Sequence, residues 1–157
     1  MGFGRWWRAI GIRGRDTKRE DDKGGTEIVK EDYFMAITER KKSTSTMYPL
    51  FFVNNSTRTI DSLEVCRPGT RDTGGQKFKR LRPGKCVEEA IFNDWDFDWI
   101  TERHVYMKAG NETIYLYFYI PKYFIGWKDD WVDTLPVLKR PGWICYPKDM
   151  RILSTAP

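Results

Sequence analysis

From Tyr33 onward, short apolar runs alternate with clusters of turn-forming residues, a pattern typical of β-strands. The clearest run is 113–120, Thr-Ile-Tyr-Leu-Tyr-Phe-Tyr-Ile, in which tyrosine alternates with aliphatic residues and phenylalanine. Successive side chains of a strand point to opposite faces. We therefore expect the aliphatic residues and phenylalanine to face a core and the tyrosines to line the other side.

Further strands are predicted in the same way, with turn-forming residues between them. Arg-Pro-Gly occurs at 67–69, 82–84 and 140–142, and its proline and glycine suit the two central positions of a type II turn. Ala109-Gly110-Asn111 predicts a hairpin. The predicted strands are 33–40, 47–53, 59–66, 76–81, 85–92, 103–108, 112–120 and, as a last edge strand, 143–146. These features predict an all-β fold, a single β-sandwich or compact barrel of about 7–9 short antiparallel strands.

The segment 122–157 is expected to form an irregular, aromatic-rich C-terminal tail. Trp127 and Trp131 are four residues apart, a spacing that suits one or two helical turns, but several prolines follow them. We expect the aromatic residues of this tail to pack across an open end of the sandwich. Aromatic residues make up 15% of the chain, which also favours β structure.

The first 27 residues have a different pattern and are expected to form an arm and linker attached to a domain at 28–157. Phe3, Trp6, Trp7 and Ile10 would share one face of a helix. Several glycines make a helix here costly in water, so we expect it to form only on contact with a partner. The polar segment 16–25 is expected to be a flexible linker.

Charge makes this arm the most informative part of the chain. Its first 19 residues contain six basic side chains against Asp16, which accounts for the whole formal charge of +5. Cations interleaved with aromatic residues suit phosphates and unpaired bases, or an anionic membrane surface, and the sequence leaves both partners open. A third alternative is an arm whose tryptophans fold back onto the domain and whose charge aids solubility. The expected polyanion-binding residues are Arg5, Trp6, Trp7, Arg8, Arg13, Arg15, Lys18 and Arg19.

The predicted domain carries two segments of opposite charge. The first is a second basic patch, formed by Arg67, Arg71, Lys77, Lys79, Arg80, Arg82 and Lys85. The second segment, 88–102, contains six acidic residues and no basic residue before Arg103. The two could pair between copies, which would give self-association, pair within one molecule, or face water. We expect one of the last two.

Three further features are weighed as sites. The tyrosines at 115, 117 and 119 could stack bases or sugars or contact a protein partner, but cover by the Trp-rich tail is slightly favoured. If the row is open, Tyr115, Tyr117 and Tyr119 are the expected protein-interaction residues. In 94–99, Asp alternates with Trp and Phe, which would place the three carboxylates on one face of a strand. An outer acidic face is preferred there over a Ca²⁺ site or a hydrolase. His104, the single histidine, is expected to be structural.

The cysteines and the N-terminus favour an intracellular protein. Cys66, Cys86 and Cys145 have no metal-ligand spacing and are expected to be reduced, with a Cys66–Cys86 bridge considered only for an exported chain. No signal peptide or membrane span is expected, nor any metal, cofactor or small-molecule substrate. The favoured function is non-enzymatic docking on nucleic acid or an anionic membrane, in a structural assembly of coat or matrix type. The alternative is an adaptor or inhibitor that binds a protein partner.

Overall fold

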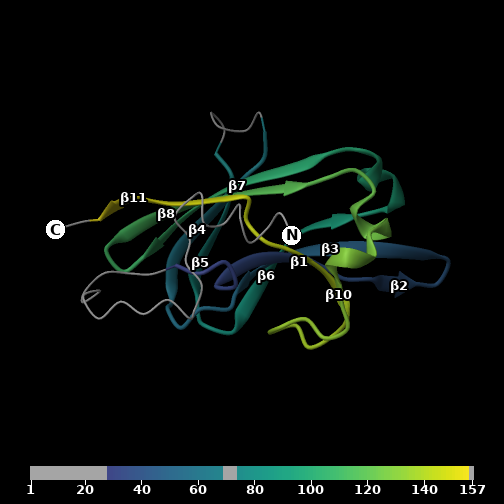
Figure 1. The fold of residues 1–157 in the computed structure, drawn as a ribbon, viewed down its shortest axis with the longest axis horizontal. Helices are drawn as coiled ribbons and strands as arrows, with labels where there is room; N and C mark the ends of the chain where they lie inside the picture. The colour runs from purple at the N-terminus through teal and green to yellow at the C-terminus, as the bar shows by residue number, and fades with distance from the viewer. Residues whose placement is uncertain (1–27, 69–73, 156–157) are drawn as a thin grey trace.

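The computed structural model describes residues 28–68 and 74–155, which form two packed antiparallel β-sheets. These residues contain eleven strands and three short 3-10 helices, with no α-helix among them. Figure 1 shows the sheets as two layers, with β7, β8 and β11 in one and β1, β3 and β10 in the other. The expectation of an all-β, sandwich-like fold is therefore confirmed. Residues 1–27, with all the predicted arm residues, lie outside the described residues.

The first sheet is built around the long strand β3, which is flanked by β1 and β2 on one side and by β6 on the other. On the far side of β1 the sheet continues with β10 and β9. Its strands are β1 (Tyr33–Ile37), β2 (Arg40–Lys42), β3 (Ser45–Asn54), β6 (Lys85–Phe92), β9 (Trp131–Val132) and β10 (Gly142–Cys145).

The second sheet has five strands in the order β11-β8-β7-β4-β5. Its strands are β4 (Ile60–Cys66), β5 (Gln76–Leu81), β7 (Thr101–Ala109), β8 (Glu112–Ile120) and β11 (Asp149–Thr155). Gly110, at φ +64°, lies between β7 and β8 and forms the predicted hairpin. The predicted alternation in β8 is also present, because Ile114, Leu116, Phe118 and Ile120 are buried while the tyrosines between them are half-buried.

The main core lies between the two sheets, and the first sheet is also covered on its outer face. Met35, Leu50 and Phe52 face the main core, together with the aliphatic residues of β8. A second cluster on the other face contains Phe34, Phe51, Val53 and Ile144 and is closed by Leu135. Burial on both faces explains why β1 reads as a continuous apolar run, Tyr-Phe-Met-Ala-Ile.

The C-terminal segment contributes more to the sheets than its sequence predicts. The predicted edge strand 143–146 is β10, which lies inside the first sheet between β1 and β9. The edge of the second sheet is formed by β11, which the prolines and charges around it concealed. The expectation of an irregular tail therefore holds only for 121–141 apart from strand β9, a stretch that also contains the 3-10 helices η2 (Phe124–Gly126) and η3 (Lys128–Asp130).

The segment Asp94–Asp98 is the 3-10 helix η1 and not a strand, and its three aspartates are exposed, as expected for an acidic outer face. Asn93 caps the helix by accepting hydrogen bonds from the backbone N–H groups of Trp95 and Asp96. The Asp96 carboxylate accepts one in return from the N–H of Asn93. This reciprocal cap satisfies backbone donors that a strand would have used in pairing, and it buries Phe97 alone among the aromatic residues of the helix.

The two Arg-Pro-Gly tripeptides that lie wholly within the described residues take different structures, whereas the turn predicted at 67–69 extends beyond those residues. At 82–84, Gly84 has φ +74° and Lys85 N–H donates to the Arg82 carbonyl at 3.2 Å, which confirms the predicted turn. Gly142 instead belongs to strand β10, so the turn predicted at 140–142 is wrong. A Cβ atom at position 142 would lie 2.4 Å from the Ile37 carbonyl oxygen, so glycine is needed there for close strand approach.

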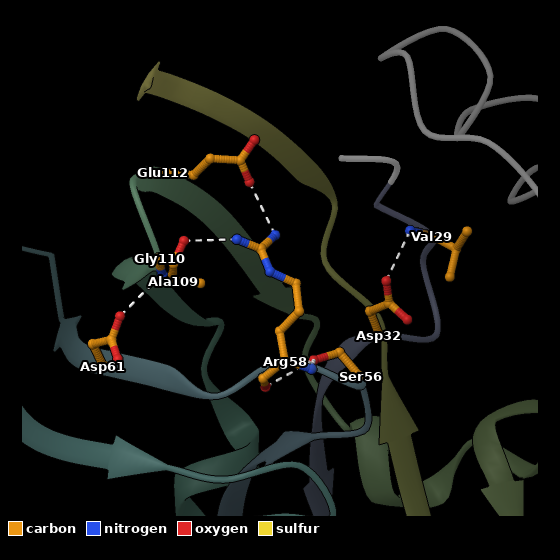
Figure 2. Close-up of polar contacts among 8 residues, drawn as sticks. All are labelled: Val29, Asp32, Ser56, Arg58, Asp61, Ala109, Gly110 and Glu112. Carbon is orange, nitrogen blue, oxygen red and sulfur yellow. Dashed lines mark hydrogen bonds and ion pairs between the residues drawn. The ribbon is translucent and has the colours of Figure 1, made fainter. Parts of the chain in front are cut away.

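A polar cluster closes the end of the sandwich at which the described chain begins (Figure 2). The Arg58 guanidinium donates to Glu112 at 2.9 Å and to the Ala109 carbonyl at 2.6 Å. Nearby, Asp32 accepts a hydrogen bond from Val29 N–H at 3.2 Å. The segment 1–27 is therefore joined to the domain beside the β7–β8 turn, at the end of the sandwich where β8 begins.

Candidate functional site

The outer face of the second sheet carries a row of aromatic side chains that the described residues leave partly accessible. Its central strands are β7 and β8, whose outward side chains pair across the sheet as His104 with Tyr117 and Tyr106 with Tyr115. Tyr106 is 36% exposed, and the neighbouring rings are half-buried. We call this surface the tyrosine face and define it by Tyr106, Tyr115, Tyr117, Tyr119 and His104.

The rings of the tyrosine face form a continuous row because neighbouring positions on the two strands stack. His104 lies 5.1 Å from the Tyr117 ring and 6.0 Å from the Tyr115 ring, centroid to centroid, at interplanar angles of 30° and 21°. Tyr106 lies 5.2 Å from Tyr115. His104 is therefore a half-buried member of this aromatic row.

Hydrogen bonds hold these rings in place. The Tyr117 hydroxyl donates to a carboxylate oxygen of Glu102 at 2.5 Å, and the Tyr115 hydroxyl lies 2.8 Å from His104 Nδ1. Burial, followed by the hydrogen bond to Glu102, raises the pKa of Tyr117. Burial also raises the pKa of Tyr115. Both phenols are therefore neutral hydrogen-bond donors at physiological pH, and the face carries no phenolate charge.

Several cations adjoin the tyrosine face on the described strands, together with the carboxylates of Glu64, which lies between Lys77 and Tyr106, and Glu102, opposite Tyr119. Lys148 Nζ lies 4.6 Å from the centroid of the Tyr119 ring, and the Arg151 guanidinium lies 5.9 Å from the Tyr115 ring while pairing with Asp149. Lys108 is exposed on β7, and Lys77 and Lys79 are exposed on β5. Strand register places Lys79 and Lys108 on either side of Ser62, so these cations share the face with the tyrosines.

The second basic patch is divided by the fold. Lys77 and Lys79 belong to the rim of the tyrosine face, whereas Arg80, Arg82 and Lys85 are exposed around the β5–β6 connection. Arg67 instead contacts Glu89 at 3.3 Å, so the two oppositely charged segments pair within one molecule at this point. Arg71 lies outside the described residues. The sequence therefore located two of the cations that adjoin the tyrosine face.

Several members of the site could not be found from sequence alone. Tyr106, Lys148 and Arg151 reach the tyrosine row because β7 and β11 pair with β8. Arg151, for example, is opposite Tyr115, which lies 36 positions earlier in the chain. A usable signal did exist for β7, because Glu102, His104, Tyr106 and Lys108 alternate with buried residues. In β11, the register with β8 shifts between Ile152 and Ser154, so the strand has no regular alternation of buried and exposed residues that the sequence could reveal.

The chemistry that this surface offers is stacking, cation–π contact and hydrogen bonding. Among the described residues there is no group of three or more His, Cys, Asp or Glu side chains placed to hold a metal ion. Cys66, Cys86 and Cys145 are free thiols, and burial raises the pKa of each. The Cys66–Cys86 bridge considered for an exported chain is not formed.

The part of the chain that the structure describes has no helix with the length and hydrophobicity needed to cross a bilayer. Comparisons of the chain with protein-family models, with curated proteins and with solved structures gave no match. The site is therefore interpreted from its own geometry.

Proposed function

We propose that this protein is a non-enzymatic binder of single-stranded nucleic acid, with the tyrosine face as a base-stacking platform and the basic arm 1–27 as an electrostatic tether. The observation that supports this most is the row of stacked, partly exposed rings on an uncovered sheet face, rimmed by cations. Every base has a π-face, so such a row binds unpaired strands with little sequence preference.

Stacking supplies the first part of the binding energy. A base stacked on an aromatic side chain contributes about 1–3 kcal/mol. Tyr106 is the most exposed ring of the face and is the first candidate for this contact. The phenol oxygens nearby are neutral, so they can accept hydrogen bonds from base N–H groups without repelling phosphates.

Phosphate contacts supply the second part. Lys77, Lys79 and Lys108 are exposed on strands adjoining the row, at positions where a backbone lying along the sheet would pass. The first 19 residues of the chain add six more basic side chains. Each phosphate neutralised releases counterions, so binding is expected to weaken steeply with salt.

The test is the affinity of the full-length protein for a labelled oligothymidylate of about 12 nucleotides, measured by fluorescence anisotropy across a salt series. Tyr106→Ala is expected to weaken binding about fivefold or more, the loss of one stacking contact. Lys79→Ala is expected to lower the salt slope by about 0.7, the value for one phosphate contact on a single strand.

Two controls make the result specific. Tyr106→Phe keeps the ring and is expected to bind like the unaltered protein. Ile91→Ala removes an exposed apolar side chain from β6 in the other sheet and should also have no effect. If Tyr106→Ala binds normally, the tyrosine face is not the platform. Binding to anionic vesicles in place of the oligonucleotide would assign the arm to a membrane surface.

A further inference from the structure

A second exposed aromatic surface lies where β6 and β8 end and β7 begins, at the far end of β8 from the Arg58–Glu112 contact. Trp95 is 79% exposed and Trp99 is 71% exposed, and Tyr123, Trp127 and Trp131 are also exposed. A hydrogen bond from Tyr123 N–H to the Phe97 carbonyl at 2.7 Å joins the two segments that carry them. We call this surface the aromatic end. So many exposed tryptophans in one place indicate an interaction surface.

The aromatic end is acidic and hollowed. Its two segments, 93–100 and 121–133, contain six aspartates against two lysines. A cleft of about 580 Å³ lies beside Trp95, between the β2–β3 hairpin and the start of η1. Its walls include Asp94, Asn93 and Lys41. A ligand that fits this end should therefore be cationic and should carry aromatic side chains.

The first residues of the same chain have this composition. Residues 3–15 contain four arginines and no acid, together with Phe3, Trp6, Trp7, Ile10 and Ile12. We propose that the aromatic end is the docking surface for residues 3–15 of the same molecule, with tryptophans of the arm packing against Trp95 and Trp99. The positive charge of the arm complements the acidic residues of the surface, and the aromatic residues of the arm can pack against its exposed tryptophans.

Chain length permits this contact within one molecule. The arm leaves the domain beside the start of β8, and the aromatic end follows the end of β8, nine residues away. At about 3.4 Å per residue this is a separation of about 27 Å. The 12 residues between 15 and 28 span up to about 40 Å when extended. Docking within one molecule is then favoured over docking between molecules, because the tether sets a local concentration in the millimolar range.

The experiment places a benzophenone photocrosslinking residue at position 10 of the full-length protein, in place of Ile10. After irradiation, the crosslinked peptides are identified by mass spectrometry and the products are sized on a denaturing gel. The expected result is crosslinking to 93–100 or 121–133 in a product of monomer mass. The double variant Trp95→Ala/Trp99→Ala is expected to lower the yield at least about fivefold.

A matched double variant, Ile152→Ala/Leu153→Ala, removes two exposed apolar side chains from β11 and should leave the yield unchanged. Arg5→Glu/Arg8→Glu should lower it, because the surface is acidic. Crosslinking to the tyrosine face, or none to the domain, would overturn the proposal. Crosslinking to the aromatic end in a product of dimer mass would overturn the assignment to the same molecule and make a second copy the occupant.

Discussion

At the scale of single residues, a buried ion pair connects the two sheets beneath the tyrosine face. Arg103 Nε on β7 donates to Glu89 on β6 at 2.9 Å, and both side chains are almost fully buried. Arg103 also donates to the backbone carbonyl of Glu102, whose carboxylate accepts the Tyr117 hydroxyl. Burial lowers the pKa of Arg103, and Glu89 opposes that shift. Each charge therefore depends on the other for compensation in the core.

Removing one partner of this pair is expected to be costly. Glu89→Gln leaves the Arg103 guanidinium buried without a counter-charge, which should lower the free energy of unfolding by about 3–5 kcal/mol. The measurement is equilibrium urea denaturation followed by circular dichroism.

The adjacent residue provides the control for this prediction. Glu88 pairs with Arg40 at 2.8 Å, but both side chains are more than one-third exposed. Glu88→Gln should therefore cost less than about 1 kcal/mol. Similar losses for the two variants would mean that burial does not govern the strength of the Glu89–Arg103 pair.

At the scale of elements, local sequence patterns predict well where strands occur, but they predict poorly which strands pair with each other in a sheet. Strand β8 and its hairpin with β7 follow from alternation and a glycine turn that lie within about 20 residues of sequence. The position of β10 in the sheet does not follow from a local pattern, because β10 pairs with a strand far away in the sequence, with Met35 opposite Cys145. Close packing at this long-range contact, and not a turn, requires Gly142.

Gly142→Ala tests this interpretation of β10. The added methyl would meet the Ile37 carbonyl oxygen at 2.4 Å and Leu135 Cδ1 at 2.7 Å, so the strands must shift. We expect a loss of about 1–3 kcal/mol in unfolding free energy, measured by urea denaturation. Gly126→Ala is the comparison, because no atom lies within 4 Å of its added Cβ and its change should be within about 0.5 kcal/mol. Equal effects would argue against close strand approach as the reason for glycine.

At the scale of the whole molecule, the arm has two potential partners, the aromatic end and a polyanion. If one segment binds both, then nucleic acid must compete with the domain for it. An arm that is free about one-fifth of the time weakens its apparent affinity for nucleic acid about fivefold. The proposed docking would therefore regulate the proposed binding.

Trp95→Ala/Trp99→Ala should then bind the labelled oligothymidylate about fivefold more tightly than the unaltered protein, because the arm is released. Anisotropy titrations at one fixed salt concentration measure this, with Ile152→Ala/Leu153→Ala as the reference. Weaker binding by the tryptophan variant would instead indicate that the aromatic end itself contacts nucleic acid. Unchanged affinity would mean that docking and nucleic-acid binding do not compete.

The sequence by itself determined the all-β class, most of the strands, the turns at 82–84 and 109–111, and the outward tyrosines of β8. These follow from periodicity and turn preferences, which act over a few residues. It also located the charge of the arm, whose role stays a prediction. Only the tertiary structure decided that Tyr106, His104 and Arg151 join the tyrosines, that Glu89 pairs with Arg103, and that the tryptophans of η1 stay exposed. These depend on which distant strands pair and on which faces are covered, and long-range packing sets both.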